Sequence, residues 1–377
     1  MIISILAFFV VLSVLVLVHE LGHFLLAKKA GVKVEEFGFG LPPRLAGIKR
    51  GETVYSLNWI PFGGFVKLYG EDLEDYGKNG QNQGRAFWAK PISARAGIVV
   101  AGVVFNFLLA LLAFTAVYSY AGIPEETQRL TVLGVLPDSP ASESGIQGGD
   151  LLLSVDGINL TGMQSGEDVV ETFSQAVAGK KGTEISLKVQ RDESELTYTV
   201  TPRVDYPQDQ GPLGVAITNV EMVKYPWWQM PFRAVPQGLK EAFGWTGLII
   251  ASLGKMLADL FGQGVVPKDL AGPIGIFQIT SQVARTGVVN LIQFMGVLSV
   301  NLAIFNILPF PALDGGRIIF LVYELVTRKR PKPELERKVN SVGLAFLIGL
   351  IALITVNDLA RLLDTAPLFA GLRSLFN

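Results

Sequence analysis

Residues 2–18, IISILAFFVVLSVLVLV, form an uncharged apolar run that leads directly into His19-Glu-Leu-Gly-His23. Apolar residues continue to Ala27, giving about 25 residues, enough to cross a bilayer as a helix. On a helix, residues four apart share a face, so both imidazoles reach one metal ion. The glutamate between them can act as general base toward a water molecule. The stretch therefore predicts a zinc hydrolase site that begins inside a membrane-spanning helix.

A cleaved signal peptide is the alternative for this run. Signal peptides carry positive charge before the apolar stretch. Here the first lysines, Lys28 and Lys29, come after it. We therefore favour a permanent span.

The composition agrees with a membrane protein and restricts the metal chemistry. Of 377 residues, 50% are hydrophobic and 17% charged, with a mean hydropathy of +0.41. Soluble domains average about a quarter charged residues. The chain has no cysteine and only two histidines, so the remaining metal ligands must be carboxylates. A net charge of −1 gives no argument for a nucleic-acid partner, and none is expected.

Three further spans are predicted at residues 96–122, about 288–308 and about 342–356, the last with an amphipathic continuation to Leu363. Residues 238–261 are ambiguous, because their uncharged part is short and closely flanked by charges. Segments of that kind are typical of interfacial or re-entrant helices. We expect a membrane-associated helix there.

Charge asymmetry orients the spans. Residues 28–95 hold 11 Lys and Arg against 7 Asp and Glu, and residues 317–338 hold 7 against 3. Residues 122–236 hold 8 against 16. The positive-inside rule places the first two segments in the cytoplasm and the acidic one outside. Four spans with both termini outside satisfy this rule, whereas a fifth would move residues 317–338 outside.

A third metal ligand is predicted at Asp314, in the run Asn306-Ile-Leu-Pro-Phe-Pro-Ala-Leu-Asp314-Gly-Gly316. Pro309 and Pro311 interrupt regular helix at the end of the third span. Broken backbone at membrane depth lines a cavity or is buried in protein, and an ionisable group beside it indicates a functional site. The first and third spans both run outside to inside, so Asp314 reaches a depth similar to that of the histidines. Alternatively, Asp314 caps the following helix.

Three asparagines lie on the second and third spans: Asn106, Asn301 and Asn306. They can hydrogen-bond between helices or hold the backbone or oxyanion of a substrate. Sequence reasoning from the residues leaves both roles open.

At these residues the chain resembles the bacterial site-2 proteases, zinc metalloproteases that cleave within the membrane, and most closely the regulator of sigma-E protease type. The resemblance covers almost the whole length. Besides His19–His23 and Asn306–Gly316, it includes Gly38-Phe-Gly40, Ile60-Pro-Phe-Gly-Gly-Phe-Val-Lys-Leu68 and Gly272-Pro-Ile-Gly-Ile276. The second span departs from the family's Gly-Pro-x-x-Asn, reading Gly102-Val-Val-Phe-Asn106.

The resemblance implies that His19, His23 and Asp314 bind one zinc ion and that Glu20 is the catalytic base. It implies substrate contacts for Asn301 and Asn306, and we expect the same of Asn106.

The resemblance also implies a membrane re-entrant β-hairpin at about residues 53–70. Its β-branched and aromatic residues, with Pro-Phe-Gly-Gly at a turn, agree. Gly63, Gly64 and Phe65 would then bind an unwound substrate at an exposed strand edge. A plain cytoplasmic hairpin is the alternative.

Residues 123–205 are similar to a circularly permuted PDZ domain, with Gly145-Ile-Gln-Gly-Gly-Asp150 and a strand at residues 184–190. Such a domain would bind peptide termini or exclude bulky substrates. A spacer without a ligand is the alternative. Residues 206–286 are expected to be a linker with membrane-associated amphipathic helices.

The expected architecture is a polytopic α-helical membrane protein with four transmembrane helices, a re-entrant β-hairpin and an inserted extracytoplasmic PDZ domain. Residues 1–122 hold the first two spans and residues 287–377 the last two. The expected function is intramembrane cleavage of single-pass proteins, such as anti-sigma factors or signal-peptide remnants, in the bacterial inner membrane. The active site would face the cytoplasm. The alternatives are a non-catalytic PDZ adaptor, a transporter, or a metalloprotease acting on soluble peptides at the membrane surface.

Overall fold

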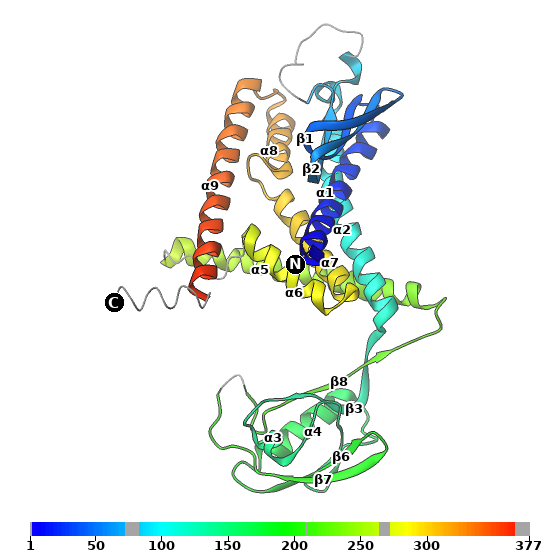
Figure 1. The fold of residues 1–377 in the computed structure, drawn as a ribbon, viewed down its shortest axis with the longest axis vertical. Coiled ribbons are helices and arrows are strands. Elements are labelled where there is room, and N and C mark those ends of the chain that lie inside the picture. The colour runs from blue at the N-terminus through cyan, green and yellow to red at the C-terminus, as the bar shows by residue number, and fades with distance from the viewer. Residues whose placement is uncertain (1, 72–82, 208–209, 264–271, 366–377) are drawn as a thin grey trace. The chain divides into compact units, whose positions relative to one another are not determined.

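A computed structural model describes residues 2–71, 83–207, 210–263 and 272–365. The chain divides into two compact units. The helical unit joins Met1–Tyr120 to Pro231–Asn377, and the inserted unit is Ala121–Met230. Figure 1 shows the helices and strands along the chain.

Among the described residues, four helices are long and apolar enough to cross a membrane. They are α1 (Ile2–Lys29), α2 (Ile92–Ala121), α7 (Val288–Ile307) and residues Glu334–Val356 within α9 (Pro333–Thr365). The four spans predicted from the sequence coincide with these four helices, whose length and composition suit an integral membrane protein. Short 3-10 helices η2 (Gln83–Arg85) and η3 (Phe87–Ala89) lead into α2.

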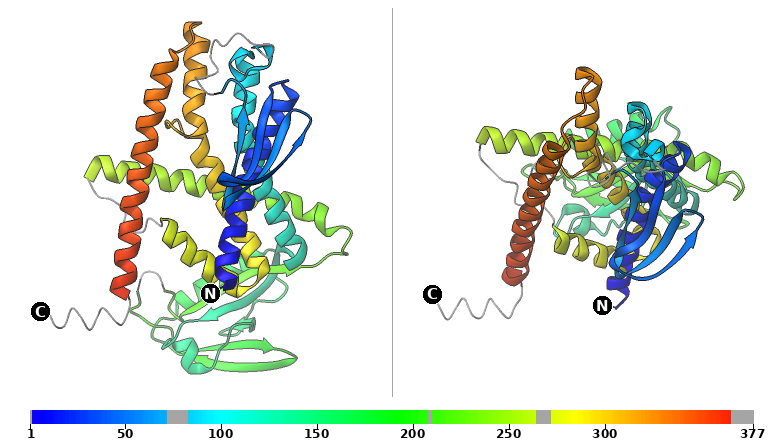
Figure 2. Two further views of the ribbon diagram at one scale, coloured as in Figure 1. Left: turned by 45° about the horizontal axis from the view of Figure 1, so that its top comes forward. Right: turned by 90° about the horizontal axis from the view of Figure 1, so that it is seen from above.

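The described part of the helical unit also contains the helices α5 (Met230–Gln263), α6 (Pro273–Thr286) and α8 (Asp314–Thr327). By length and composition α5 is not a candidate span. It runs crosswise to α9 in both Figure 1 and Figure 2. Apolar side chains of α5, among them Ala242, pack on Phe114 of α2 and Val300 of α7. The membrane-associated helix that the sequence predicts at residues 238–261 lies within α5, and its association with the membrane stays a prediction.

The strands β1 (Val34–Arg50) and β2 (Thr53–Leu68) form a sheet beside α1. Residues 44–50 pair with 53–58, while 36–39 pair with 54–57 on one side and 64–67 on the other. Both strands are therefore bent, and the sheet has four rows. The sequence predicted a hairpin within residues 53–70 alone. β2 does bend near Gly63 (φ +77°), but residues 36–39 lie between its two halves.

The order of the rows leaves residues 64–67 at one edge of the sheet. At the turn between the strands, Glu52 accepts hydrogen bonds from Arg85 and Lys28 at 2.8 Å each. These bonds lower the pKa of Glu52 to about 2. The carboxylate therefore stays charged and ties the sheet to the end of α1.

The inserted unit is built on a six-stranded sheet in the order β7-β6-β4-β3-β8, with β5 beside β4. Its strands are β3 (Ile123–Val135), β4 (Leu151–Val155), β5 (Ile158–Asn159), β6 (Ile185–Arg191), β7 (Ser194–Val200) and β8 (Val215–Val223). The helices α3 (Pro140–Ser144) and α4 (Gly166–Ala178) contribute apolar side chains to its core. Because β8 pairs with β3, the unit extends beyond the boundary predicted at residue 205.

Candidate metal centre

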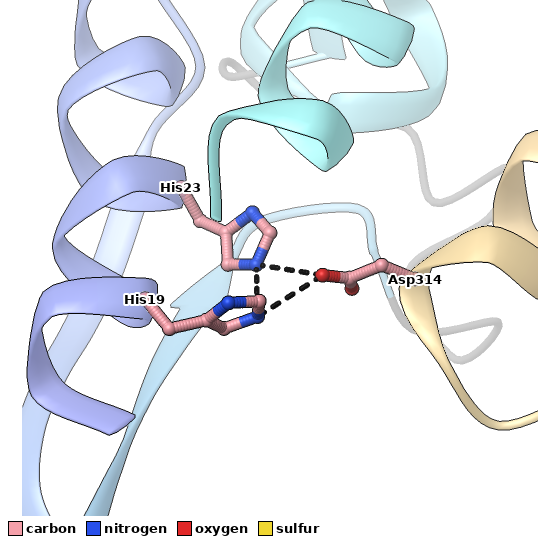
Figure 3. A group of neighbouring side chains, drawn as sticks. All are labelled: His19, His23 and Asp314. Carbon is pink, nitrogen blue, oxygen red and sulfur yellow. Dashed lines mark hydrogen bonds and ion pairs between the residues drawn. The ribbon is translucent and has the colours of Figure 1, made fainter. Parts of the chain in front are cut away.

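The two histidines of α1 face one another across a buried space. His19 and His23 are 7% and 8% exposed, and their Nε2 atoms lie 3.1 Å apart. The helical spacing of four residues brings both rings to one face. Figure 3 shows both rings turned toward Asp314.

Asp314 comes from the break between α7 and α8. Pro309 and Pro311 end the helix, and the chain turns through Ala312 at a φ of +72° before α8 begins at Asp314. The N-cap residue of α8 is Leu313, and no side chain caps the helix. The alternative role of Asp314 as a cap is therefore not what the structure shows. Instead, its Oδ2 atom lies 3.0 Å from His19 Nε2 and 3.2 Å from His23 Nε2.

These three atoms fit a zinc ion. Tetrahedral zinc with bonds of about 2.0–2.1 Å holds its ligand atoms about 3.3 Å apart. The three separations here, 3.0, 3.1 and 3.2 Å, are close to that value. Among the described residues, the buried Asp314 Oδ2 has no hydrogen-bond donor, although it lies within ion-pair distance of both rings. Converging lone pairs of this kind are stabilised by a cation.

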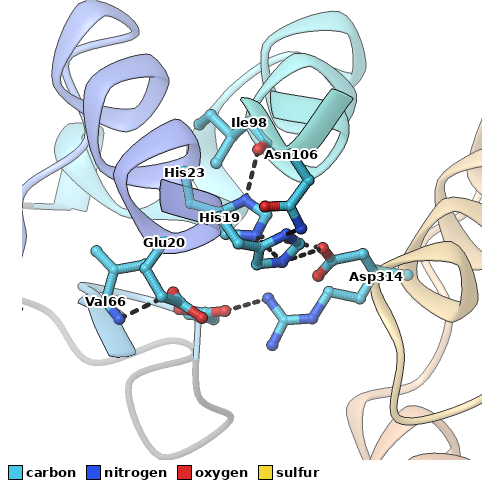
Figure 4. A network of polar contacts seen from close by, with 9 residues as sticks. His19, Glu20, His23, Val66, Ile98, Asn106 and Asp314 are labelled. Atoms are coloured by element: carbon cyan, nitrogen blue, oxygen red, sulfur yellow. Dashed lines mark hydrogen bonds and ion pairs between the residues drawn. The ribbon is translucent and has the colours of Figure 1, made fainter. Parts of the chain in front are cut away.

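The outer ring atoms are held by α2, as Figure 4 shows. His23 Nδ1 lies 2.8 Å from the carbonyl oxygen of Ile98, which accepts its proton and leaves the Nε2 lone pair for a metal. His19 Nδ1 lies 3.2 Å from the side-chain amide of Asn106. Asn106 is fully buried and contacts His19, and the substrate contact predicted for it from the sequence stays a prediction.

Glycines make room for the two rings. A Cβ atom on Gly102 of α2 would lie 2.5 Å from His23 Nε2 and 2.6 Å from His19 Cε1. A Cβ atom on Gly22 of α1 would lie 2.5 Å from the carbonyl oxygen of Ala101. Small residues of this kind allow membrane helices to approach closely. The histidine pair is therefore enclosed by the contact between α1 and α2.

Glu20 lies beside the metal centre without being part of it. Its Oε2 atom accepts a hydrogen bond of 3.1 Å from the backbone amide of Val66, in the edge row of the sheet (Figure 4). Glu20, the two histidines and Asp314 line one cavity of about 190 Å³. That volume holds several water molecules. A carboxylate beside a hydrated metal site can move a proton.

The residues predicted to contact substrate lie at different distances from the cavity. Phe65 lines the cavity, and a Cβ atom on Gly64 would lie 3.8 Å from Glu20 Cγ. Gly63 forms the bend of β2. Asn301 and Asn306 lie on α7 and are partly exposed. In the parts of the chain that the structure describes, neither is hydrogen-bonded to the histidines or to Asp314.

The sequence did not point to Ile98 and Val66, whose backbone atoms contact His23 and Glu20, or to Glu71 and Arg317, which line the same cavity. The first two act through backbone atoms, which leave no trace in residue type. Arg317 could have been noticed, because it follows Asp314 by one helical turn and places a second charge near the break.

Comparison with protein families gives one match over most of the chain. The model of peptidase family M50 matches residues 7–350.

Individual relatives agree with that match. A Clostridium perfringens protein that carries the provisional name of a zinc metalloprotease is 37% identical, over 92% of this chain and 96% of its own. The regulator of sigma-W protease RasP of Bacillus subtilis is 30% identical, over 95% and 99%. The zinc metalloprotease RasP of Geobacillus kaustophilus is 29% identical, over 95% and 98%.

Proposed function

Since the chain belongs to peptidase family M50, the site-2 zinc metalloproteases, we propose that it hydrolyses a peptide bond within the transmembrane segment of single-pass membrane proteins. The observation that carries the proposal is the convergence of His19 Nε2, His23 Nε2 and Asp314 Oδ2 within 4.8 Å, with both histidines on the apolar span α1. The proposed ligands of the single zinc ion are these three residues.

The proposed chemistry divides between the ion and the protein. Zinc bound there supplies Lewis-acid polarisation of the peptide carbonyl and lowers the pKa of the attacking water. Glu20 takes the proton of that water on its carboxylate and returns it to the leaving amine. The Val66 amide fixes the carboxylate by bonding one oxygen, so the other is free to accept the proton. Ile98 and Asn106 keep the two imidazoles oriented.

The edge row of the sheet is the proposed holder of the substrate backbone. Peptide bonds in a helix are protected by their own hydrogen bonds, so a spanning substrate must be unwound before cleavage. Residues 64–67 form a sheet edge, and Phe65 and Val66 line the cavity with Glu20. An extended substrate segment added at this edge would lie beside the catalytic residues. Gly63, Gly64 and Phe65 belong to this surface, and Asn301 and Asn306 are proposed to contact the segment from α7.

For the inserted unit we propose a PDZ-like role outside the cytoplasm. Its sheet ends at β8, whose outer edge is unpaired among the described strands and can add a peptide strand. The acidic character of residues 122–236 supports an extracytoplasmic position, and the basic residues 317–338 support a cytoplasmic-side active site in the bacterial inner membrane. Anti-sigma factors and signal-peptide remnants are the proposed substrate classes.

Two variants test the proposal in detergent with a transmembrane substrate. Glu20→Gln is expected to keep zinc and to lose cleavage, because an amide cannot accept the proton. Asp314→Asn is expected to lose zinc, measured by elemental analysis of the purified protein. Glu334→Gln, at an exposed position at the start of α9, is the matched control for both. Undiminished cleavage by Glu20→Gln would refute the base assignment.

The alternatives give different results in the same assays. A PDZ adaptor or transporter holds no stoichiometric zinc. A surface metalloprotease would cleave soluble peptides as fast as membrane-embedded ones, whereas the proposed enzyme prefers embedded substrates.

A further inference from the structure

An ion pair joins two separate parts of the metal cavity. Arg317 Nη1 contacts Glu71 Oε1. Arg317 lies on α8, one turn after Asp314, and Glu71 follows the end of β2. Both side chains line the cavity of the metal centre, and both line a second cavity of about 660 Å³ next to it.

The pair bridges elements that otherwise pack elsewhere. The sheet packs on α1, whereas α8 packs on α7. Because α7 also packs on α1, one path from Asp314 to the histidines of α1 runs through α7, and the ion pair adds a second path through the sheet. The side chains of Glu71 and Arg317 in this second path are 18% and 39% exposed.

A short path of contacts leads from the pair to the proposed base. Glu71 Oε2 accepts a hydrogen bond of 3.3 Å from the amide of Leu68. Two residues earlier, the amide of Val66 donates to Glu20 Oε2 at 3.1 Å. The segment 66–71 is thus tied at one end to Glu20 and at the other to Arg317.

We infer that Glu71 and Arg317 are a positioning pair, which holds the end of β2, and through Val66 the carboxylate of Glu20, at a fixed place relative to Asp314. The inference rests on the proposed function, since it concerns the geometry between the base and a metal ligand. Neither side chain needs to touch the substrate. Small displacements between reacting groups are costly, and a shift of about 1 Å can lower a rate about a hundredfold.

The neighbouring pair Arg95–Glu324 serves as a contrast. Its atoms lie 2.7 Å apart and its side chains are 8% and 11% exposed. It joins α2 to α8 without touching the sheet. Breaking it is therefore expected to act on folding.

The experiment measures kcat, KM and zinc content of the full-length protein in detergent with a transmembrane substrate. Arg317→Gln and Glu71→Gln are each expected to lower kcat about ten- to a hundredfold, with KM within about twofold and zinc retained. The double variant is expected to be no worse than either single one, because the two side chains act together. Arg317→Lys, which keeps the charge, is expected to recover most of kcat. Arg337→Gln, an exposed arginine on the rim of the larger cavity, is the control and is expected to leave kcat unchanged.

Two results would overturn the inference. One is additive loss in the double variant, and the other is loss of zinc or of folded protein equal to the loss of rate. The unaltered protein and Glu20→Gln, measured in parallel, separate the positioning pair from the proposed function. If the unaltered protein holds no zinc and does not cleave the transmembrane substrate, the proposed function fails. If the unaltered protein cleaves and Glu20→Gln is inactive while Arg317→Gln is fully active, only the positioning pair fails.

Discussion

At the scale of single residues, the candidate metal centre depends on the lack of a side chain at Gly102. His19 and His23 occupy the volume that any side chain at position 102 would need. The rings are then locked by Ile98 and Asn106, one helical turn to either side of that gap. Glycine at this position is therefore as necessary to the candidate site as the proposed ligands are.

Gly102→Ala is predicted to impair zinc binding. The added methyl group would overlap both imidazoles, so the rings must turn away from Asp314. We expect at least a tenfold loss of zinc affinity, by analogy with the effect of disturbing the partners of ligating histidines. Competition with a zinc chelator measures it. Gly97→Ala on the same helix is the control, since a Cβ atom there meets nothing within 4 Å. Equal affinity in the two variants would contradict the prediction.

Much of the residue-level site could be predicted from sequence, because side chains carry its chemistry. His19, Glu20 and His23 form a local motif with helical spacing. Asp314 could be predicted as the third ligand because the chain has no other histidine and no cysteine, and because Asp314 lies beside the interrupted third span. The partners Ile98 and Val66 could not be predicted, because their contribution is a backbone atom brought close by tertiary packing. Asn106 was noticed, but its burial against His19 is a property of the fold.

At the scale of elements, the short contacts of α6 explain another part of the family resemblance. The carboxylate of Asp358, on α9, accepts a hydrogen bond of 2.9 Å from the amide of Gly275 in the first turn of α6. A Cβ atom on Gly272 would lie 2.7 Å from the same carboxylate. The lack of a side chain at Gly272 thus lets the Asp358 carboxylate of α9 approach the N-terminus of α6 and accept a hydrogen bond there. Asp358 is 6% exposed.

Asp358→Ala is predicted to loosen α9. It removes a charged acceptor from a buried helix terminus, which costs about 1.5–3 kcal/mol. The measurement is the melting temperature of the protein in detergent. Asp358→Asn keeps an acceptor and is expected to cost less than the alanine variant. The exposed Glu334→Ala, at the other end of α9, is the control. A larger effect of Glu334→Ala than of Asp358→Ala would refute the prediction.

Helices were easier to predict than strands in this chain. Each span is a continuous apolar run, and its length alone indicates a membrane helix. The sheet was predicted only in part. Residues 36–39 pair with both 54–57 and 64–67, and no local pattern in residues 36–39 indicates these two pairings. β8 was assigned to a linker for the same reason: its partner β3 lies at the opposite end of the inserted unit.

At the scale of the whole molecule, the inserted unit carries an acid-sensitive contact. Asp150 is fully buried and accepts hydrogen bonds from Arg191 at 2.7 and 2.8 Å and from the Gln147 amide at 2.9 Å. Burial alone would raise the pKa of Asp150, but the bonds and charge of Arg191 lower it below its usual value. The stabilisation is therefore present above the unfolded pKa of about 4 and is lost as pH falls through the lower folded value.

The unit spanning residues 121–230 is predicted to lose stability steeply below about pH 4. Asp150→Asn should flatten that acid limb and cost about 1.5–3 kcal/mol at neutral pH, because a hydrogen-bonded charge is removed. Thermal unfolding of the excised unit from pH 2 to 7 measures both. Asp192→Asn, on the exposed turn between β6 and β7, is the control. An Asp150→Asn variant with an unchanged acid limb would contradict the assignment.

The orientation of the whole molecule is open to a direct test, since the chain has no cysteine. Asp192→Cys, on the inserted unit, is predicted to react with a membrane-impermeant maleimide in intact spheroplasts. Lys329→Cys, after α8, is predicted to react only after permeabilisation. Both positions are exposed, so access to solvent does not distinguish them. The opposite pattern would reverse the proposed topology.

The division of the proposed ligand set along the chain has a consequence for biosynthesis. Two ligands and the base are made with the first span, whereas Asp314 lies in the last fifth of the chain. Chains are synthesised from the N-terminus, so for most of its translation the nascent protein holds an incomplete set that binds zinc weakly. On the proposed ligand set, a newly made chain is therefore expected to be inactive toward neighbouring membrane proteins until the segment that carries Asp314 has been inserted. The order of synthesis would then delay proteolysis until most of the protein is in place.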